Sequence, residues 1–586
     1  MNRSRLMQAA NGQIPFDLVL KNVQLVNVFT KEIYPADIGI CEGYIAHVTQ
    51  PGEEGLSGER EYDAQGKYAV PGMIDTHIHI ESTMMNPTNF AKAVLPHGTT
   101  TVVTDPHELA NVLGLEGVRY ILESSAHLPL RLYVLAPSCV PSALGVETSG
   151  AAFNASEIAT MLEWERVIGL AEVMDFPGVI YQSERMKEIL EVARKKGCFL
   201  QGHVPFLTGR GLSAYQCSGI NSDHEVVATN EAIYKLRAGM ALECRESSIV
   251  QNIKALVPAL KACNFPPNAT LCTDDREPDD LLNEGHLDHV IRRAIQEGVP
   301  VLEAIKMCTY NAAQLTKLYD HGAIAPAHVA DIVLVEDLIN FTVNEVFIGG
   351  ELVAKEGKMA VELTSPRHPV EKRNTIKLKS IPSAATFQIE AGQKEKAVVN
   401  VIAYDSENPL LTKLAKIEVL VKDGKIDISQ NPELAYISIL ERHGRNGNIS
   451  VGLVQGLGIA KGAIASTVSH DCHNLTVIGR EPEDMALAAQ ELAKSGGGIV
   501  CVAKGKVLAK VELPIAGLMS PKCVEELAPE TFHLKKAIKG LGLVGDYPLL
   551  RVTTFALAVI PEFKMTDQGL VDVLSQEFIP ILPEEN

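Results

Sequence analysis

The chain has 586 residues, and its 72 acidic residues exceed its 53 lysines and arginines, which gives a formal net charge of −19. This excess excludes a nucleic acid or an anionic membrane as the main partner, because both require clustered positive charge. A hydrophobic share of 46% excludes a disordered chain. No signal peptide and no apolar run of about 18 residues is recognisable, so we expect a cytoplasmic protein without membrane contact.

Cysteine usage narrows the kind of metal site that is possible. The chain has 11 cysteines, an odd number, and no two of them form a C-x-x-C pair. Scattered cysteines in a long chain are typical of reduced, buried thiols in a reducing compartment. No zinc-finger spacing is present. Any bound metal must therefore be held by histidines and carboxylates.

Two distant segments have the short, β-branched runs of strands. Neither segment is long enough to form a closed sheet alone. We therefore expect residues 1–70 and 325–364 to pair into one composite β-sandwich, split around an inserted domain. Strands are expected at residues 17–20, 23–26, 38–40, 44–48, 331–335, 343–347 and 351–353.

Between these segments, short apolar runs that end in polar residues alternate with helical stretches. This alternation is typical of βα units, and eight units in about 250 residues fit a (β/α)8 barrel, an α/β fold, over residues 71–324. Helices are expected at 183–196, 284–297 and 300–318. The eight expected strands are residues 73–79, 100–105, 131–137, 167–173, 198–203, 219–224, 240–244 and 269–274.

From Ser365 onward the pattern changes again. A proline-flanked charged run at residues 371–373 indicates a linker, and an α+β domain is expected over residues 365–586. A hairpin around Lys504 and Gly505 is its clearest β signal. Strands are expected at residues 398–403, 416–421, 499–503 and 507–511, and helices at 483–494 and 569–574.

Metal-capable side chains recur at the ends of the expected barrel strands, which is where barrel active sites lie. His77 and His79 share one face of the first strand because side chains alternate with period two. A lone histidine at a strand end is more often a hydrogen-bonded structural residue. The joint pattern instead predicts a site for two divalent metals with one bridging carboxylate. Its expected ligands are His77, His79, Glu172, His203, His224 and Asp274.

Residues 71–79, Pro-Gly-Met-Ile-Asp-Thr-His-Ile-His, resemble the opening of the amidohydrolase superfamily, whose barrel begins with an H-x-H strand. The split sandwich and residues 308–313 resemble that superfamily too. Narrower matches resemble its bacterial two-metal adenine deaminases, and with the C-terminal segment they cover nearly the whole chain. These matches are residues 104–108, 169–174, 201–203, 222–225, 272–275 and 469–474.

The resemblance implies hydrolysis of adenine to hypoxanthine and ammonia by a metal-bound hydroxide, in purine salvage. It implies Mn²⁺ or Fe²⁺, with Zn²⁺ also possible, and a homodimer. Glu172 stands where hydantoinases, dihydroorotases and ureases have a lysine, so a direct carboxylate bridge is expected. Asp274 would move the proton from the water to the leaving ammonia. The alternatives are another amidohydrolase acting on a cyclic amide or amino-heterocycle, and an inactive barrel that serves as a binding module.

Further polar residues are weaker candidates. His107 and Glu108 follow the second strand and would either face the purine or start a capped loop. Glu225 and Asp275 each follow a ligand and are expected to orient it from behind. The histidine-rich residues 469–474 form either a solvated loop or a lid over the barrel. In the lid interpretation its contacts to substrate are His470, Asp471 and His473.

Overall fold

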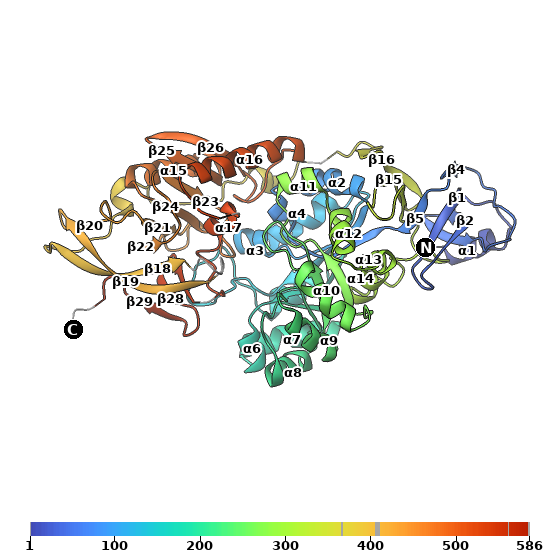
Figure 1. Cartoon of the computed structure of the whole chain (residues 1–586), viewed down its shortest axis with the longest axis horizontal. Helices are drawn as coiled ribbons and strands as arrows, with labels where there is room; N and C mark the ends of the chain where they lie inside the picture. The colour runs from blue at the N-terminus through green and yellow to red at the C-terminus, as the bar shows by residue number, and fades with distance from the viewer. Residues whose placement is uncertain (1, 365–366, 405–410, 546, 561, 584–586) are drawn as a thin grey trace.

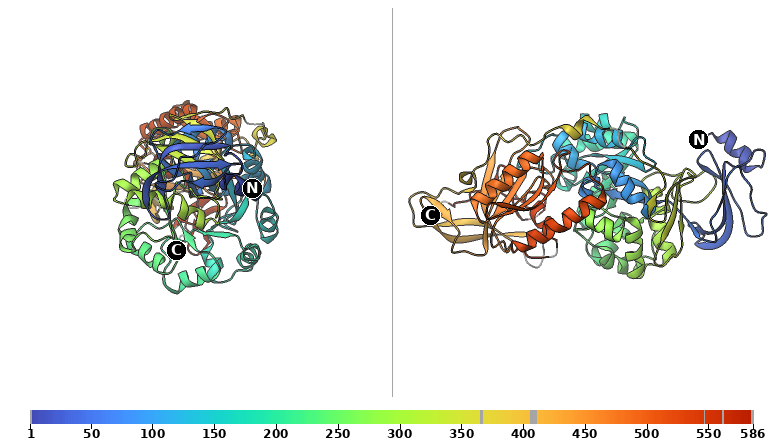
Figure 2. Two further views of the ribbon diagram at one scale, coloured as in Figure 1. Left: turned by 90° about the vertical axis from the view of Figure 1, so that its right-hand side faces the viewer. Right: turned by 90° about the horizontal axis from the view of Figure 1, so that it is seen from above.

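The computed structural model arranges the chain as three parts in a row (Figure 1). An N-terminal sheet lies at one end, the barrel in the middle and the C-terminal part at the other end, and Figure 2 shows the same row from above. The structure describes all residues except 1, 365–366, 405–410, 546, 561 and 584–586. The expected start of the linker, at Ser365 and Pro366, lies outside the described residues.

The two distant β segments pair as expected, and their described strands form one sheet of nine strands, while the sandwich arrangement stays a prediction. The junction is the antiparallel pair β5 and β14, in which Val70 lies opposite Val333. An unpredicted helix, α1 (Arg3–Ala10), buries Leu6 and Ala9 against this part. The strands are β1 (Leu18–Asn27), β2 (Glu32–Cys41), β3 (Tyr44–Val48), β4 (Glu61–Asp63), β5 (Tyr68–Pro71), β14 (Ile332–Val335), β15 (Val343–Ile348), β16 (Glu351–Lys355) and β17 (Lys358–Met359).

Eight parallel strands form the barrel, in chain order, and each lies within three residues of its expected position. A bridge between Ile78 and Asp274 connects the last strand to the first. Most of these strand residues are buried, which explains their continuous apolar runs. The strands are β6 (Met73–Ile78), β7 (Thr99–Thr104), β8 (Arg131–Pro137), β9 (Val167–Val173), β10 (Phe199–Gly202), β11 (Ser222–Asp223), β12 (Ala241–Arg245) and β13 (Ala269–Cys272).

Helices surround the barrel. The helix expected at residues 183–196 is confirmed as α7 (Glu184–Lys196), and Gly197 ends this helix with a φ of +64°. The expected helix over residues 300–318 is instead two short helices, because Thr309 leaves the helical conformation. None of the described helices is long and apolar enough to span a membrane. The others are α2 (Pro87–Val94), α3 (His107–Leu113), α4 (Leu115–Ser125), α5 (Ala155–Met161), α6 (Phe176–Ile180), α8 (Gly209–Cys217), α9 (Thr229–Arg237), α10 (Ile253–Ala262), α11 (Pro278–Glu284), α12 (Leu287–Gln296), α13 (Val301–Met307) and α14 (Tyr310–Leu315).

The C-terminal part contains a second sheet of nine strands and a small one of three. The prediction of a helix at residues 569–574 is wrong: Gly569–Asp572 form the strand β28, because Leu570 and Val571 bury opposite faces and both edges are paired. The elements are β18 (Lys396–Tyr404), β19 (Thr412–Lys422), β20 (Lys425–Asp427), β21 (Leu434–Leu440), β22 (Ile449–Gln455), β23 (Ala463–Ser466), β24 (Leu475–Gly479), α15 (Pro482–Ser495), β25 (Gly498–Ala503), β26 (Lys506–Glu512), α16 (Val524–Gly540), α17 (Pro548–Thr553), β27 (Phe563–Thr566) and β29 (Glu577–Ile579).

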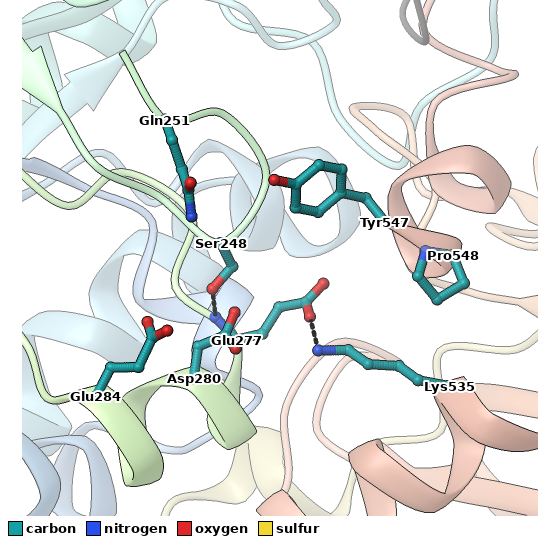
Figure 3. A pocket seen from close by; sticks show the side chains of 8 residues that line it. All are labelled: Ser248, Gln251, Glu277, Asp280, Glu284, Lys535, Tyr547 and Pro548. Carbon is teal, nitrogen blue, oxygen red and sulfur yellow. Dashed lines mark hydrogen bonds and ion pairs between the residues drawn. The ribbon is translucent and has the colours of Figure 1, made fainter. Parts of the chain in front are cut away.

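Helix α16 packs along α11 of the barrel, and Lys535 of α16 forms ion pairs across this contact. Nζ of Lys535 lies 2.7 Å from Oδ1 of Asp279 and also contacts Glu277. Figure 3 shows the Lys535–Glu277 pair on the wall of a cavity of about 140 Å³. Burial raises the pKa of the Glu277 carboxyl to about 7. The single positive charge of the lysine is therefore shared by two carboxyl groups at a half-buried junction.

We predict that Lys535→Met lowers the free energy of unfolding by about 1–3 kcal/mol, because two partly buried carboxylates lose their cation. The loss should be larger at pH 8 than at pH 5. The folded pKa of Glu277 lies above its ordinary value of 4.5, so its contribution to stability is lost as the pH rises from 4.5 to about 7. Lys535 lowers this pKa, so its removal raises the folded pKa further and the loss of stability continues above pH 7. Thermal melting at both pH values checks this. Lys536→Met, at the exposed neighbouring position, is the matched control, and an equal loss at both pH values would contradict the assignment.

Candidate active site

The barrel brings together all six expected ligands at the carboxyl ends of its strands. His77 lies in β6 and His79 follows it, and Glu172 is the penultimate residue of β9. The other three, His203, His224 and Asp274, follow β10, β11 and β13. All six are buried except His203, which is partly exposed. The strand-end pattern therefore corresponds to one compact site.

The Glu172 carboxylate lies at the centre of this site, between two pairs of imidazoles. Its Oε1 lies 3.3 Å from Nε2 of His77 and 2.8 Å from Nε2 of His79. Its Oε2 lies 2.5 Å from Nδ1 of His203 and 3.5 Å from Nε2 of His224. Each carboxylate oxygen thus faces its own pair of histidines.

Asp274 completes the side that contains His77 and His79. Its Oδ1 lies 3.6 Å from Nε2 of His77 and 3.5 Å from Nε2 of His79. Its Oδ2 accepts a hydrogen bond from Nη1 of Arg245, which also pairs with Glu225. One oxygen of Asp274 is therefore held by an arginine while the other faces the histidines.

Hydrogen bonds behind the first two histidines fix which ring nitrogen faces the centre. Nδ1 of His77 lies 2.9 Å from the side-chain oxygen of Gln201, and Nδ1 of His79 lies 3.0 Å from the carbonyl of Asp105. An acceptor at Nδ1 places the proton there and leaves Nε2 as a lone-pair donor. No described residue forms a hydrogen bond with Nε2 of His77, although this atom is buried.

This donor set fits divalent metals. Several groups, including His77, His79 and Asp274, place one ligand atom from each residue within 4.8 Å of one another. Histidine and carboxylate ligands suit manganese, iron and zinc. Burial alone would raise the pKa of the Glu172 carboxyl, but the imidazoles of His224 and His203 hold it well below its usual range. Burial likewise acts against ionisation of Asp274, but Arg245 keeps the pKa of that carboxyl low. Both carboxylates are therefore ionised and able to bind cations.

Arg245 is the main residue that the sequence analysis missed. It is the last residue of β12, whereas the expected strand stopped at Cys244. A charged residue at a barrel strand end was the signal that could have found it. Gln201, which supports His77, lies in the matched residues 201–203, but its residue type alone does not predict this role.

The expected substrate residues form a second cluster, at the junction between α3 and the loop that connects β23 to β24. Nδ1 of His470 lies 2.7 Å from Oε1 of Glu108, and Nε2 of His473 contacts Oε2 of the same carboxylate. Nε2 of His107 lies 3.7 Å from Oδ1 of Asp471. The rings of His107 and His79 lie 4.6 Å apart, centroid to centroid, so this junction adjoins the six-residue site. The loop is buried against the barrel and is not a solvated loop.

The tautomer of His473 decides what this cluster can do. Nδ1 of His473 accepts a hydrogen bond from the backbone N–H of Ser469 at 3.1 Å. Burial lowers the pKa of His473 to about 3, so its ring is neutral and its one proton lies on Nε2. That N–H donates to Glu108. Although Glu108, His470 and His473 lie close enough to hold an ion, this tautomer favours a hydrogen-bonded junction.

Glu225 lies beside the site, facing the same ring nitrogens of His203 and His224 that face Glu172, and not behind them. Oε1 of Glu225 lies 3.7 Å from Nε2 of His224 and pairs with Arg245. Asp275 accepts a hydrogen bond from the hydroxyl of Ser82. Burial and the neighbouring charge of Asp274 raise the pKa of Asp275. Their expected orienting role stays a prediction.

Comparisons with known proteins show the family of the chain. Residues 68–353 match the family model described as "Amidohydrolase family", and residues 409–577 match "Adenine deaminase C-terminal domain". The chain is 42% identical to "Adenine deaminase 2" of Carboxydothermus hydrogenoformans, over 98% of this chain and 99% of that protein. It is 40% identical to "Adenine deaminase" of Kosmotoga olearia and of Methanothrix thermoacetophila, over 99% of both chains in each pair. The chain therefore belongs to the adenine deaminase family of the amidohydrolases.

Proposed function

We propose that this chain hydrolyses adenine to hypoxanthine and ammonia. The observation that supports this most directly is the Glu172 carboxylate, each of whose oxygens faces a separate pair of histidines. That arrangement suits two divalent cations bridged by one carboxylate. The names of the full-length relatives supply the substrate.

We assign the metal ligands as the six residues that the sequence predicted. His77, His79 and Asp274 would hold one ion, and His203 and His224 the other, with Glu172 between them. Divalent ions bound there would supply a nucleophile at neutral pH by lowering the pKa of a water. Mn²⁺ or Fe²⁺ are the ions that we expect, and Zn²⁺ has the same ligand preferences.

Asp274 is our candidate for the proton transfers. It is ionised, buried, and fixed at one oxygen by Arg245, so its other oxygen can accept a proton without reorienting. The attacking water gives its proton to Asp274, and its oxygen forms the bond to C6 of adenine. The same carboxyl then protonates the amino group, which leaves as ammonia when the C6–N bond breaks.

Substrate contacts are assigned to His107, Glu108, His470, Asp471 and His473. The homodimer, the cytoplasmic location and the domain boundaries stay predictions.

We predict that the metal-loaded protein releases ammonia from adenine and shifts its ultraviolet spectrum to that of hypoxanthine. Chelation should abolish turnover, because it removes the ions that would lower the pKa of the attacking water. Activity should return when Mn²⁺ or Fe²⁺ is added. An ammonia assay before and after chelation checks this. Absence of turnover with each of these metals, in a folded protein with measured metal content, would contradict the proposal.

We predict that Asp274→Asn lowers kcat by about 10²–10⁴-fold, because an amide cannot accept the proton. Metal content should change much less, since the four histidines and Glu172 remain. Steady-state kinetics and elemental analysis of the same preparation check both parts. Asp280→Asn, the same change six residues along the chain, is the control and should keep wild-type kcat. Equal activity in the two variants would remove Asp274 from its role.

A further inference from the structure

Asp471 is a buried acid without a hydrogen-bond partner for one of its oxygens. The residue is only 3% exposed. Its Oδ1 lies 3.7 Å from Nε2 of His107 and 3.8 Å from Nδ1 of His470, beyond hydrogen-bonding distance. No described residue donates a hydrogen bond to its Oδ2, which is completely buried. Burial of an unpaired acceptor is costly, and a donor from outside the chain would satisfy it.

The position of Asp471 limits what that donor can be. A short series of contacts leads from Glu172 to His79 at 2.8 Å, from the His79 ring to the His107 ring, and from His107 to Asp471. Asp471 therefore lies about one imidazole ring beyond the metal ligands. A small heterocycle whose reacting carbon is at Glu172 would place its far end near this carboxylate.

The loop that contains Asp471 is fixed in place on both sides. His473 donates to Glu108 of the barrel, and Nε of the buried Arg442 donates to the carbonyl of His473. The side-chain nitrogen of Asn474 donates to the carbonyl of Thr148 at 2.8 Å. A preorganised acceptor gives selectivity, because it is not free to turn towards water when the correct donor is missing.

In adenine, N9 lies at the far end of the fused rings from C6 and has a hydrogen in the free base. In a nucleoside the same nitrogen is bonded to the sugar and cannot donate. We propose that Asp471 accepts a hydrogen bond from the N9–H of the purine and thereby selects the free base over N9-substituted purines. This inference rests on the proposed function, since it assumes that C6 is held at the metal ligands.

The test measures binding by isothermal titration with hypoxanthine and 9-methylhypoxanthine, neither of which has an amino group to lose. The metal-loaded wild-type chain should bind hypoxanthine at least about tenfold more tightly. Asp471→Asn should weaken hypoxanthine binding by about tenfold or more and change binding of the methyl compound by less than about threefold. With adenine the variant should raise KM and leave kcat near the wild-type value, because N9 is remote from the reacting carbon.

The control is Asp567→Asn, the same change at a buried carboxylate of the same junction whose oxygens already accept from Thr148, Asn448 and Asn474. It should reduce thermal stability and leave the preference between the two ligands unchanged. Equal weakening of both ligands in Asp471→Asn, or no weakening, would overturn the inference.

A crystal structure of the wild-type chain with hypoxanthine gives a second test that needs no variant. The expected result is an oxygen of Asp471 within hydrogen-bonding distance of N9, and any other partner for N9 would overturn the inference. Loss of ammonia release in wild type would instead count against the proposed function alone, since the binding measurements need no turnover.

Discussion

The site depends on one buried carboxylate surrounded by four imidazoles. Glu172 is almost fully removed from water, and an isolated charge there would be strongly destabilising. Two histidines face each of its oxygens. Burial of this carboxylate together with the histidines is tolerable only if cations balance its negative charge. The barrel supplies these side chains from separate strands, because the carboxyl ends of all eight strands converge at one end. The position of each ligand in the sequence follows from this convergence.

The C-terminal part contributes a second cluster of polar side chains, around Glu108, at the same end of the barrel. The six residues that we assign to the metals are arranged around charges, whereas the junction at Glu108 is arranged around a defined tautomer of His473. The backbone of Ser469 fixes the proton of His473, and that proton fixes Glu108. A neutral histidine used in this way orients a carboxylate without adding a charge to an enclosed site. The two clusters can therefore adjoin without competing for cations.

Residue periodicity was sufficient to predict the barrel, because buried parallel strands are continuous apolar runs with polar residues at their ends. That rule also predicted the six side chains that the structure brings together around Glu172. Arg245 was missed because strand ends are uncertain by a residue or two, and one residue separated it from the expected strand. Helix α16 contains Pro529, which argues against a helix when the sequence is considered alone. At residues 569–574, pairing on both edges favours a strand over the expected helix, and such pairing is tertiary information. The contact between Glu108 and His473 joins residues that no local pattern relates.

The distance along the chain between those two residues has a consequence for synthesis. They are 365 positions apart, and His473 leaves the ribosome long after the whole barrel has been made. The nascent barrel already contains every histidine and carboxylate that we assign to the ions, but its hydrophobic core continues into the C-terminal part. Until the final third of the chain is made, Glu108 lacks its partner His473, and the barrel lacks the acceptor that we propose for the purine. The last segment to be synthesised is therefore the one that completes both the core of the barrel and the second cluster at its carboxyl end.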